Sequence, residues 1–130
     1  MGEALGQRLA KSNKETDRLL EKGDIGSKFE ALRKESQRIE SIIVDRNLKG
    51  KELEKQGKIE EAIALYELNV NDEVDTPFPY DRLAVIYRKQ KWFDDEVKIL
   101  KKAVKTFPKN EKFKIQLGKA KTKLVRESVD

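Results

Sequence analysis

Apolar residues recur every three or four positions along most of the chain, which predicts amphipathic helices rather than strands. The pattern is clearest in residues 77–110, where one face of a first helix is apolar. A turn is expected at residues 90–92, and Pro108 is expected to end the second helix, because proline cannot continue a helix. The residues expected to face the core of this pair are Tyr80, Leu83, Ala84, Tyr87, Phe93, Val97, Leu100, Ala103 and Val104.

The same pattern repeats with a period of about 34 residues, which is typical of stacked helical repeats. Residues 57–59 align with residues 91–93, and residues 23–25 align in turn with residues 57–59. The offset also brings apolar positions into register on both sides of these segments. The predicted organisation is an N-terminal helical segment that forms a degenerate repeat (1–42), two clear repeats (43–76 and 77–110) and a C-terminal capping helix (111–130).

Each unit is expected to be an antiparallel helical hairpin, and the hairpins are expected to stack into a short all-α solenoid, because one pair cannot bury its apolar face alone. Small residues at Gly50 and Ala84 are expected where two helices cross, since a separation of about 8–10 Å leaves no room for a large side chain. The path of residues 28–56 stays open. One long helix would fit the spacing of the apolar residues, and so would two helices joined by a tight turn near Ser41. We favour the second arrangement, in which the chain bends near Ser41.

The unit at 77–110 resembles the tetratricopeptide repeat, whose pattern runs Trp-x2-Leu-Gly-x2-Tyr, then Ala-x3-Phe, then Pro within a single period. It departs from this pattern at Glu96, where the family prefers alanine. The unit at 43–76 matches in its second half but places Arg46 and Lys49 where tryptophan and leucine are usual. The residues of the last unit that fall on the family's positions are Tyr80, Leu83, Ala84, Tyr87, Leu100, Ala103 and Pro108.

The resemblance implies a concave surface, formed by the first helix of each pair, that binds a protein or peptide partner. Carried onto this chain position by position, the surface holds eight cations, among them Lys123 of the capping helix, and two anions, Glu54 and Asp81. An acidic peptide or protein surface is therefore the expected partner. Phe78 is either a ligand contact or a loop anchor. The residues expected to contact the partner are Asn47, Lys51, Lys55, Phe78, Arg82, Val85, Arg88, Lys89, Lys112 and Lys119.

The composition excludes several kinds of chemistry. Charged residues make up 41% of the 130 residues, the formal net charge is +5, and residues 77–130 carry fifteen basic and seven acidic side chains. The chain has no Cys and no His, which excludes disulfides, thiolate nucleophiles, His-based zinc sites and Ser–His–Asp triads. We expect neither an enzyme nor a cofactor. No apolar run resembles a signal peptide or a membrane span, so a cytoplasmic protein is expected.

Two other classes of partner stay open as alternatives. Four lysines along the second helix of the last unit could contact nucleic-acid phosphates, although they lack interleaved aromatic residues and a solvated surface explains them better. Self-assembly into a homo-oligomer could use the amphipathic segment 5–20 or the ends of the stack. Trp92, in a turn, is interpreted as a rim residue that lies over a neighbouring helix rather than as an interaction hot spot. The four lysines are Lys98, Lys101, Lys102 and Lys105.

Overall fold

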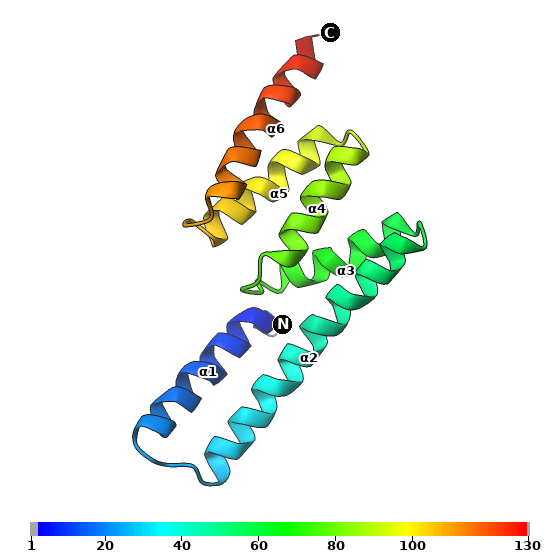
Figure 1. The fold of residues 1–130 in the computed structure, drawn as a ribbon. Coiled ribbons are helices and arrows are strands. Elements are labelled where there is room, and N and C mark those ends of the chain that lie inside the picture. Colours follow the sequence, from blue (N-terminus) through cyan, green and yellow to red (C-terminus); the bar gives the residue numbers. More distant parts are fainter. Residues whose placement is uncertain (1–2, 130) are drawn as a thin grey trace.

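The amphipathic segments of the sequence form six α-helices, and each helix packs antiparallel against the next (Figure 1). The computed structural model describes residues 3–129, and within that range it contains no strand. The predicted all-α, tetratricopeptide-like stack of helices is confirmed. The helices are α1 (Leu5–Glu21), α2 (Ser27–Lys55), α3 (Ile59–Asn71), α4 (Phe78–Lys89), α5 (Phe93–Thr106) and α6 (Glu111–Val129).

The turns inside the three predicted units share one backbone geometry. Gly23, Gly57 and Lys91 follow one another at intervals of one repeat period, and all three have a positive φ, of 73°, 77° and 62°. Each donates its backbone N–H to the carbonyl three residues back, and the next residue donates to the carbonyl five residues back. This pattern closes a helix through a left-handed residue, a position that glycine occupies without strain. The repeat period therefore reports a shared turn as well as a shared apolar face.

The bend that we favoured near Ser41 is wrong, because α2 runs unbroken for 29 residues from Ser27 to Lys55. Ile39 and Ile43 keep one helical phase across the expected turn, and both are buried. They contact Val74 and, from α1, Leu5 and Leu9, so the middle of α2 already has a packed partner. As a result, the hairpin of α1 and α2 extends away from the rest of the stack instead of stacking beside the second unit (Figure 1).

Helix α1 continues the direction of α3 along the same side of α2. The backbone N–H of Gly6, in the first turn of α1, donates to the carbonyl of Asp72 at the end of α3, with an N–O distance of 2.7 Å. This contact satisfies one of the free amides of α1, and it joins the positive end of one helix macrodipole to the negative end of another. A Cβ atom on Gly6 would lie 2.0 Å from the backbone oxygen of Glu73. The junction therefore requires glycine.

We expect Gly6→Ala to push the start of α1 away from the end of α3 and so to loosen α1, because the obstructing carbonyl oxygen of Glu73 is backbone and cannot turn aside. The cost should be about 1–3 kcal/mol, the usual range for overpacking. Hydrogen exchange should report faster exchange throughout α1, with α4 and α5 unchanged. Gly26→Ala is the matched control, since a Cβ there would come no closer than 3.5 Å to the side chain of Asp24. Unchanged protection of α1 in Gly6→Ala would contradict the junction.

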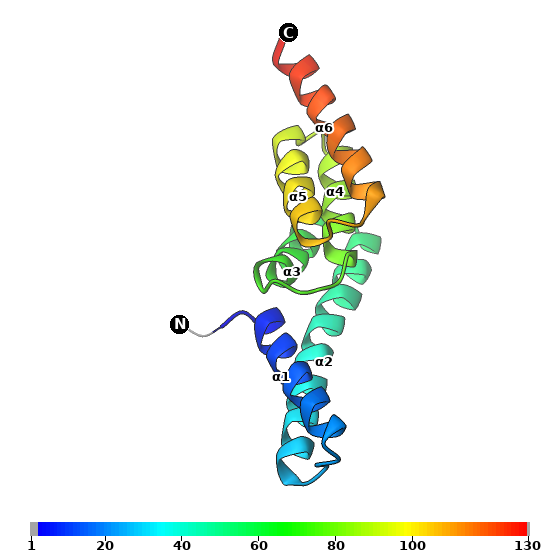
Figure 2. The ribbon, with the colours of Figure 1, turned by 90° about the vertical axis from the view of Figure 1, so that its left-hand side faces the viewer.

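The main core joins α3, α4, α5 and α6, and small residues occupy buried positions in this core and on the neighbouring α2. Ala84 has no solvent-exposed surface, and a Cβ on Gly50 would lie 2.5 Å from Cε1 of Tyr66. The predicted close approach at Gly50 is confirmed, and Ala84 is buried, as expected for a residue at such a contact. No helix in residues 3–129 combines the length and the hydropathy that a membrane span requires. In Figure 2, α3 and α5 lie on the left, and α4 and the first half of α6 lie on the right, so the hairpins form two layers.

Candidate functional site

The layer made by the first helices of the pairs contains the residues that the sequence predicts as a binding surface. The second half of α2, then α4, then α6 lie next to one another, because side chains bridge them. Arg82 of α4 donates to both carboxylate oxygens of Glu54 on α2, at 3.1 and 2.5 Å. Lys112 of α6 lies 3.1 Å from the carboxylate of Asp81 on α4. The two predicted anions of the surface therefore hold the helices together.

Glu54 is the centre of a small polar network below this surface. In addition to the hydrogen bonds from the Arg82 guanidinium, Glu54 accepts a hydrogen bond of 2.6 Å from the hydroxyl of Tyr66, a residue that is fully buried. Burial by itself would raise the pKa of Glu54, but the hydrogen bonds from Arg82 and Tyr66 outweigh it and lower that pKa. Burial and the same hydrogen bond raise the pKa of the Tyr66 hydroxyl. The network therefore keeps Glu54 charged and Tyr66 neutral at pH 7.

Arg88 is also paired inside the molecule. Its Nε lies 2.7 Å from an Oε of Glu96, and Glu96 is only 1% exposed although it stands in the first turn of α5. Glu96, which stands where the repeat pattern prefers alanine, is thus paired with Arg88 on the preceding helix. With Arg82 and Lys112, Arg88 makes three predicted site cations whose charge is compensated by a carboxylate of the same chain.

Five lysines of the predicted surface remain without such a partner. Within residues 3–129 none of them forms an ion pair, and all except Lys123, which is half-buried, are exposed. The unpaired positive charge of the surface therefore lies on lysines, whereas Arg82 and Arg88 form ion pairs with carboxylates of the same chain. The five lysines are Lys51, Lys55, Lys89, Lys119 and Lys123.

The uncharged residues of the predicted site lie closer to the core. The amide oxygen of Asn47 accepts a hydrogen bond of 2.9 Å from Asn69, which is fully buried in α3. The ring of Phe78 packs edge-on against Tyr66, with centroids 6.0 Å apart, which gives it the role of an anchor for α4. Val85 is half-buried on the same side of α4. A role in ligand binding for these three residues stays a prediction.

Sequence reasoning missed one exposed apolar residue of this surface. Val44 precedes Phe78 by one repeat period, so the repeat itself places it in the predicted groove. The structure leaves it 51% exposed, and Leu48, one turn further along α2, is 59% exposed. The offset between the repeats was the signal that could have found Val44. The surface thus combines an apolar patch near the middle of α2 with lysines further along the helices.

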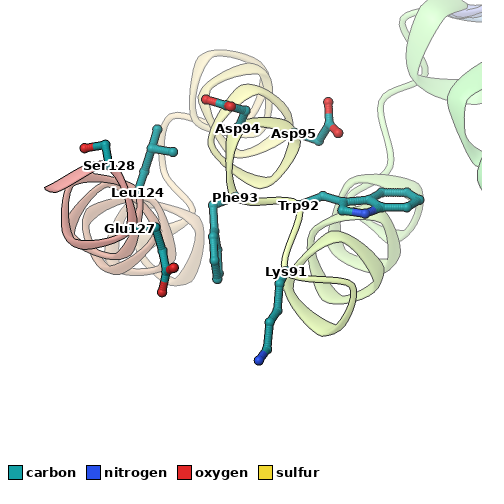
Figure 3. A pocket seen from close by; sticks show the side chains of 8 residues that line it. All are labelled: Lys91, Trp92, Phe93, Asp94, Asp95, Leu124, Glu127 and Ser128. Atoms are coloured by element: carbon teal, nitrogen blue, oxygen red, sulfur yellow. The ribbon is translucent and has the colours of Figure 1, made fainter. Parts of the chain in front are cut away.

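A separate hollow of about 600 Å³ lies where the turn between α4 and α5 meets the end of α6 (Figure 3). The ring of Phe93 stands between Lys91 on one side and Leu124 and Glu127 on the other (Figure 3). The side chain of Trp92 points away from Phe93. The indole lies over Tyr87, with ring centroids 6.1 Å apart, and is 42% exposed. The prediction that Trp92 lies over a neighbouring helix is confirmed, whereas its absence from a binding interface stays a prediction. The four lysines of α5 are all exposed, and they belong to the layer formed by α3 and α5, opposite the predicted surface.

Among the described residues, no group of three or more acidic side chains is arranged to hold a metal ion. Comparison with known proteins points to one family: the family model described as tetratricopeptide repeat matches residues 79–110, which form α4, α5 and the turn that follows. No curated protein and no solved structure matches the chain.

Proposed function

We propose that this chain, in which residues 79–110 match the tetratricopeptide repeat family, is a small adaptor or regulator that binds an acidic segment of another protein. Repeats of this family are protein-interaction modules, and the layer of α2, α4 and α6 corresponds to the surface that their first helices present. The partner would lie across these three helices. The proposal goes beyond the family's general role in naming the charge of the partner.

The observation that carries the proposal is the separation of paired and unpaired cations on this layer. Arg82, Arg88 and Lys112 are neutralised by carboxylates of the same chain, whereas five lysines are not. Unpaired charges of one sign on one face create a positive potential, which steers an acidic partner toward it and disfavours a basic one. Val44 and Leu48 add exposed apolar area that a bound segment could cover.

Peptide selection tests this proposal even while the partner is unidentified. A displayed library of random peptides should yield acidic sequences on the unmodified chain. Reversing three of the free lysines (Lys51→Glu, Lys89→Glu and Lys119→Glu) should abolish their capture, because each attraction becomes a repulsion. Arg82 is not used, since its loss would leave the carboxylate of Glu54 without its cation and disturb the fold.

The matched control reverses three lysines of the opposite layer: Lys98→Glu, Lys101→Glu and Lys105→Glu. It changes the net charge by the same amount but leaves the proposed surface intact, so capture of the acidic peptides should persist. Selection of neutral or basic peptides by the unmodified chain would contradict the proposal. Equal losses of capture in both triple variants would show that net charge matters and not this surface.

Nucleic acid has weaker support as a partner, because carboxylates stand beside the lysines of α5. Lys98 and Lys102 share a hollow with Glu67 and Asp95, and Lys105 lines another with Glu73. These acidic side chains reduce the attraction for phosphates. Association through α5 and self-assembly therefore stay predictions, which gel shifts at two salt concentrations and light scattering at several protein concentrations can test.

A further inference from the structure

Helix α6 has the register of a first helix, but the side that would receive a second helix is open. Figure 1 shows α6 at the end of the stack, packed against α5. Gly118 follows Ala84 by one repeat period and Gly50 by two. Gly50 faces Tyr66 of α3 and Ala84 has no exposed surface, so other parts of the chain cover both positions. A Cβ atom on Gly118, by contrast, would meet no atom of residues 3–129 within 4 Å.

The open side of α6 is basic. Lys114 and Lys121 stand one repeat period after Tyr80 and Tyr87, which are both buried in α4. Lys114 lies 3.3 Å from a carboxylate oxygen of Glu111 on the same helix, an exposed pair that a partner can replace. An apolar second helix would not fit here, because it would bury ammonium groups without a partner. The residues of this side, the α6 stripe, are all exposed: Lys114, Ile115, Gly118, Lys121, Thr122 and Val125.

Helix α3 of the same chain carries the complementary surface. Its 13 residues include three glutamates and no basic residue, whereas α6 has six basic and two acidic residues. Helix α3 packs against α2 and α4, and its remaining side is exposed. On that side Leu68 is 46% exposed, one turn after Ala64. The residues of this side, the α3 stripe, are all exposed: Glu60, Glu61, Ala64, Glu67, Leu68 and Asn71.

The two stripes match in length, in the position of their small residues and in charge. Each spans about 16 Å, or three helical turns. Antiparallel packing with Ala64 opposite Gly118 puts the smallest residues at the closest approach of the helices. The same register places the glutamates at the start of α3 beside Lys121, and it places Leu68 beside Ile115. Antiparallel helices also bring opposite ends of their macrodipoles together.

We propose that two copies of this chain associate through these surfaces, with the α3 stripe of one copy packed on the α6 stripe of the other. The α3 stripe then takes the position of a second helix beside α6. Because the two stripes belong to different helices of one chain, the contact either closes reciprocally in a dimer or continues head to tail. The two stripes contain none of the residues predicted to contact a peptide, so this proposal does not depend on the proposed function.

Charge reversal tests the contact by sedimentation velocity at several protein concentrations. The unmodified chain should associate at low salt as its concentration rises, and it should dissociate at high salt. Reversal of the α6 stripe (Lys114→Glu and Lys121→Glu) should weaken the association about tenfold or more, because attractions become repulsions. Reversal of the α3 stripe (Glu60→Lys and Glu61→Lys) should do the same. A mixture of the two variants should associate again, since each reversed stripe then meets a stripe of opposite charge.

Two further variants separate the contact from net charge and from folding. Glu67 is not reversed, because it accepts a hydrogen bond of 2.6 Å from the hydroxyl of Tyr87. Gly118→Gln adds bulk without charge where a single chain has free space, so it should weaken association while circular dichroism stays unchanged. The variant Lys14→Glu and Lys22→Glu, on and just after α1, changes the net charge as much as reversal of the α6 stripe does. It should leave the association intact.

A chain that stays monomeric at low salt and high concentration would overturn the proposal. Loss of association in the Lys14 and Lys22 variant would overturn it in favour of a contact through the N-terminal hairpin. A mixture that stays monomeric, although both variants are fully helical, would exclude the pairing of α3 with α6. Binding of an acidic helical peptide to a monomeric chain through Lys114 and Lys121 would assign the α6 stripe to another protein. None of these results affects the capture of acidic peptides by the layer of α2, α4 and α6.

Discussion

Replacement of Arg88 by alanine is expected to destabilise the fold by about 3 kcal/mol, the lower end of the range for removing one partner of a buried ion pair. The guanidinium is the cation that compensates Glu96, whose carboxylate is almost fully buried between α4 and α5. One carboxylate oxygen of Glu96 has no hydrogen-bond partner even with Arg88 present. Without the arginine, the charge would face the positive end of the α5 macrodipole alone, which is worth less than a direct pair.

A double-mutant cycle separates this effect from the loss of packing. Glu96→Ala restores the alanine of the family's pattern and removes the buried charge, so we expect its stability within about 1 kcal/mol of the unmodified chain. In that background Arg88→Ala should cost less than about 1 kcal/mol, because no buried carboxylate is left behind. Urea denaturation followed by circular dichroism measures the stability of the unmodified chain, the two single variants and the double variant. Equal costs of Arg88→Ala in both backgrounds would exclude the ion pair as the cause.

The repeated helical hairpin could be predicted because its determinants are local and periodic. Leu83 and Ala84 on one helix and Leu100 on the next follow the helical spacing of buried residues, and all three have no exposed surface. The turns at Gly57 and Lys91 repeat the same hydrogen-bond pattern one period apart. Apolar phase and turn geometry are properties of short stretches of sequence, so the sequence of a single chain is sufficient to predict them.

The course of α2 could not be predicted from the same signals, because Ile39 and Ile43 keep their phase in a continuous helix and in a bent one. What selects the continuous helix is a tertiary contact. The start of α1 meets the end of α3 at Gly6 and Asp72, and Val74 covers the two isoleucines from the following loop. These residues lie about 30 to 70 positions apart in the chain. Periodicity carries no information about contacts at such separations.

The candidate surface was predicted by position, whereas the state of its charges was not. Arg82 and its partner Glu54 stand 28 residues apart, and Arg88 and Glu96 stand eight residues apart with a turn between them. Neither separation is one at which side chains pair along a helix. A count of charges on the predicted face therefore overstated its free positive charge. The structure assigns the free charge to lysines, and this is the distinction on which the proposed ligand depends.

Replacement of Gly50 by alanine is expected to destabilise the protein by about 2 kcal/mol, although alanine is the better helix former by about 1 kcal/mol. The new Cβ would lie 2.5 Å from Cε1 and 2.7 Å from Cζ of Tyr66. That ring cannot move aside, because its hydroxyl is bound to Glu54 and its edge packs against Phe78. Thermal unfolding should therefore show a lower melting temperature despite the gain in helix propensity.

Gly118→Ala is the matched control for Gly50→Ala, because it introduces the same side chain into a helix interior where no atom lies within 4 Å of the new Cβ. It should raise the stability by up to about 1 kcal/mol. In a Tyr66→Leu background, which removes the two obstructing ring carbons, Gly50→Ala should no longer be destabilising. A higher melting temperature for Gly50→Ala in the unmodified chain would contradict the close packing of α2 on Tyr66, and with it the way in which α2 joins the layer that carries the lysines.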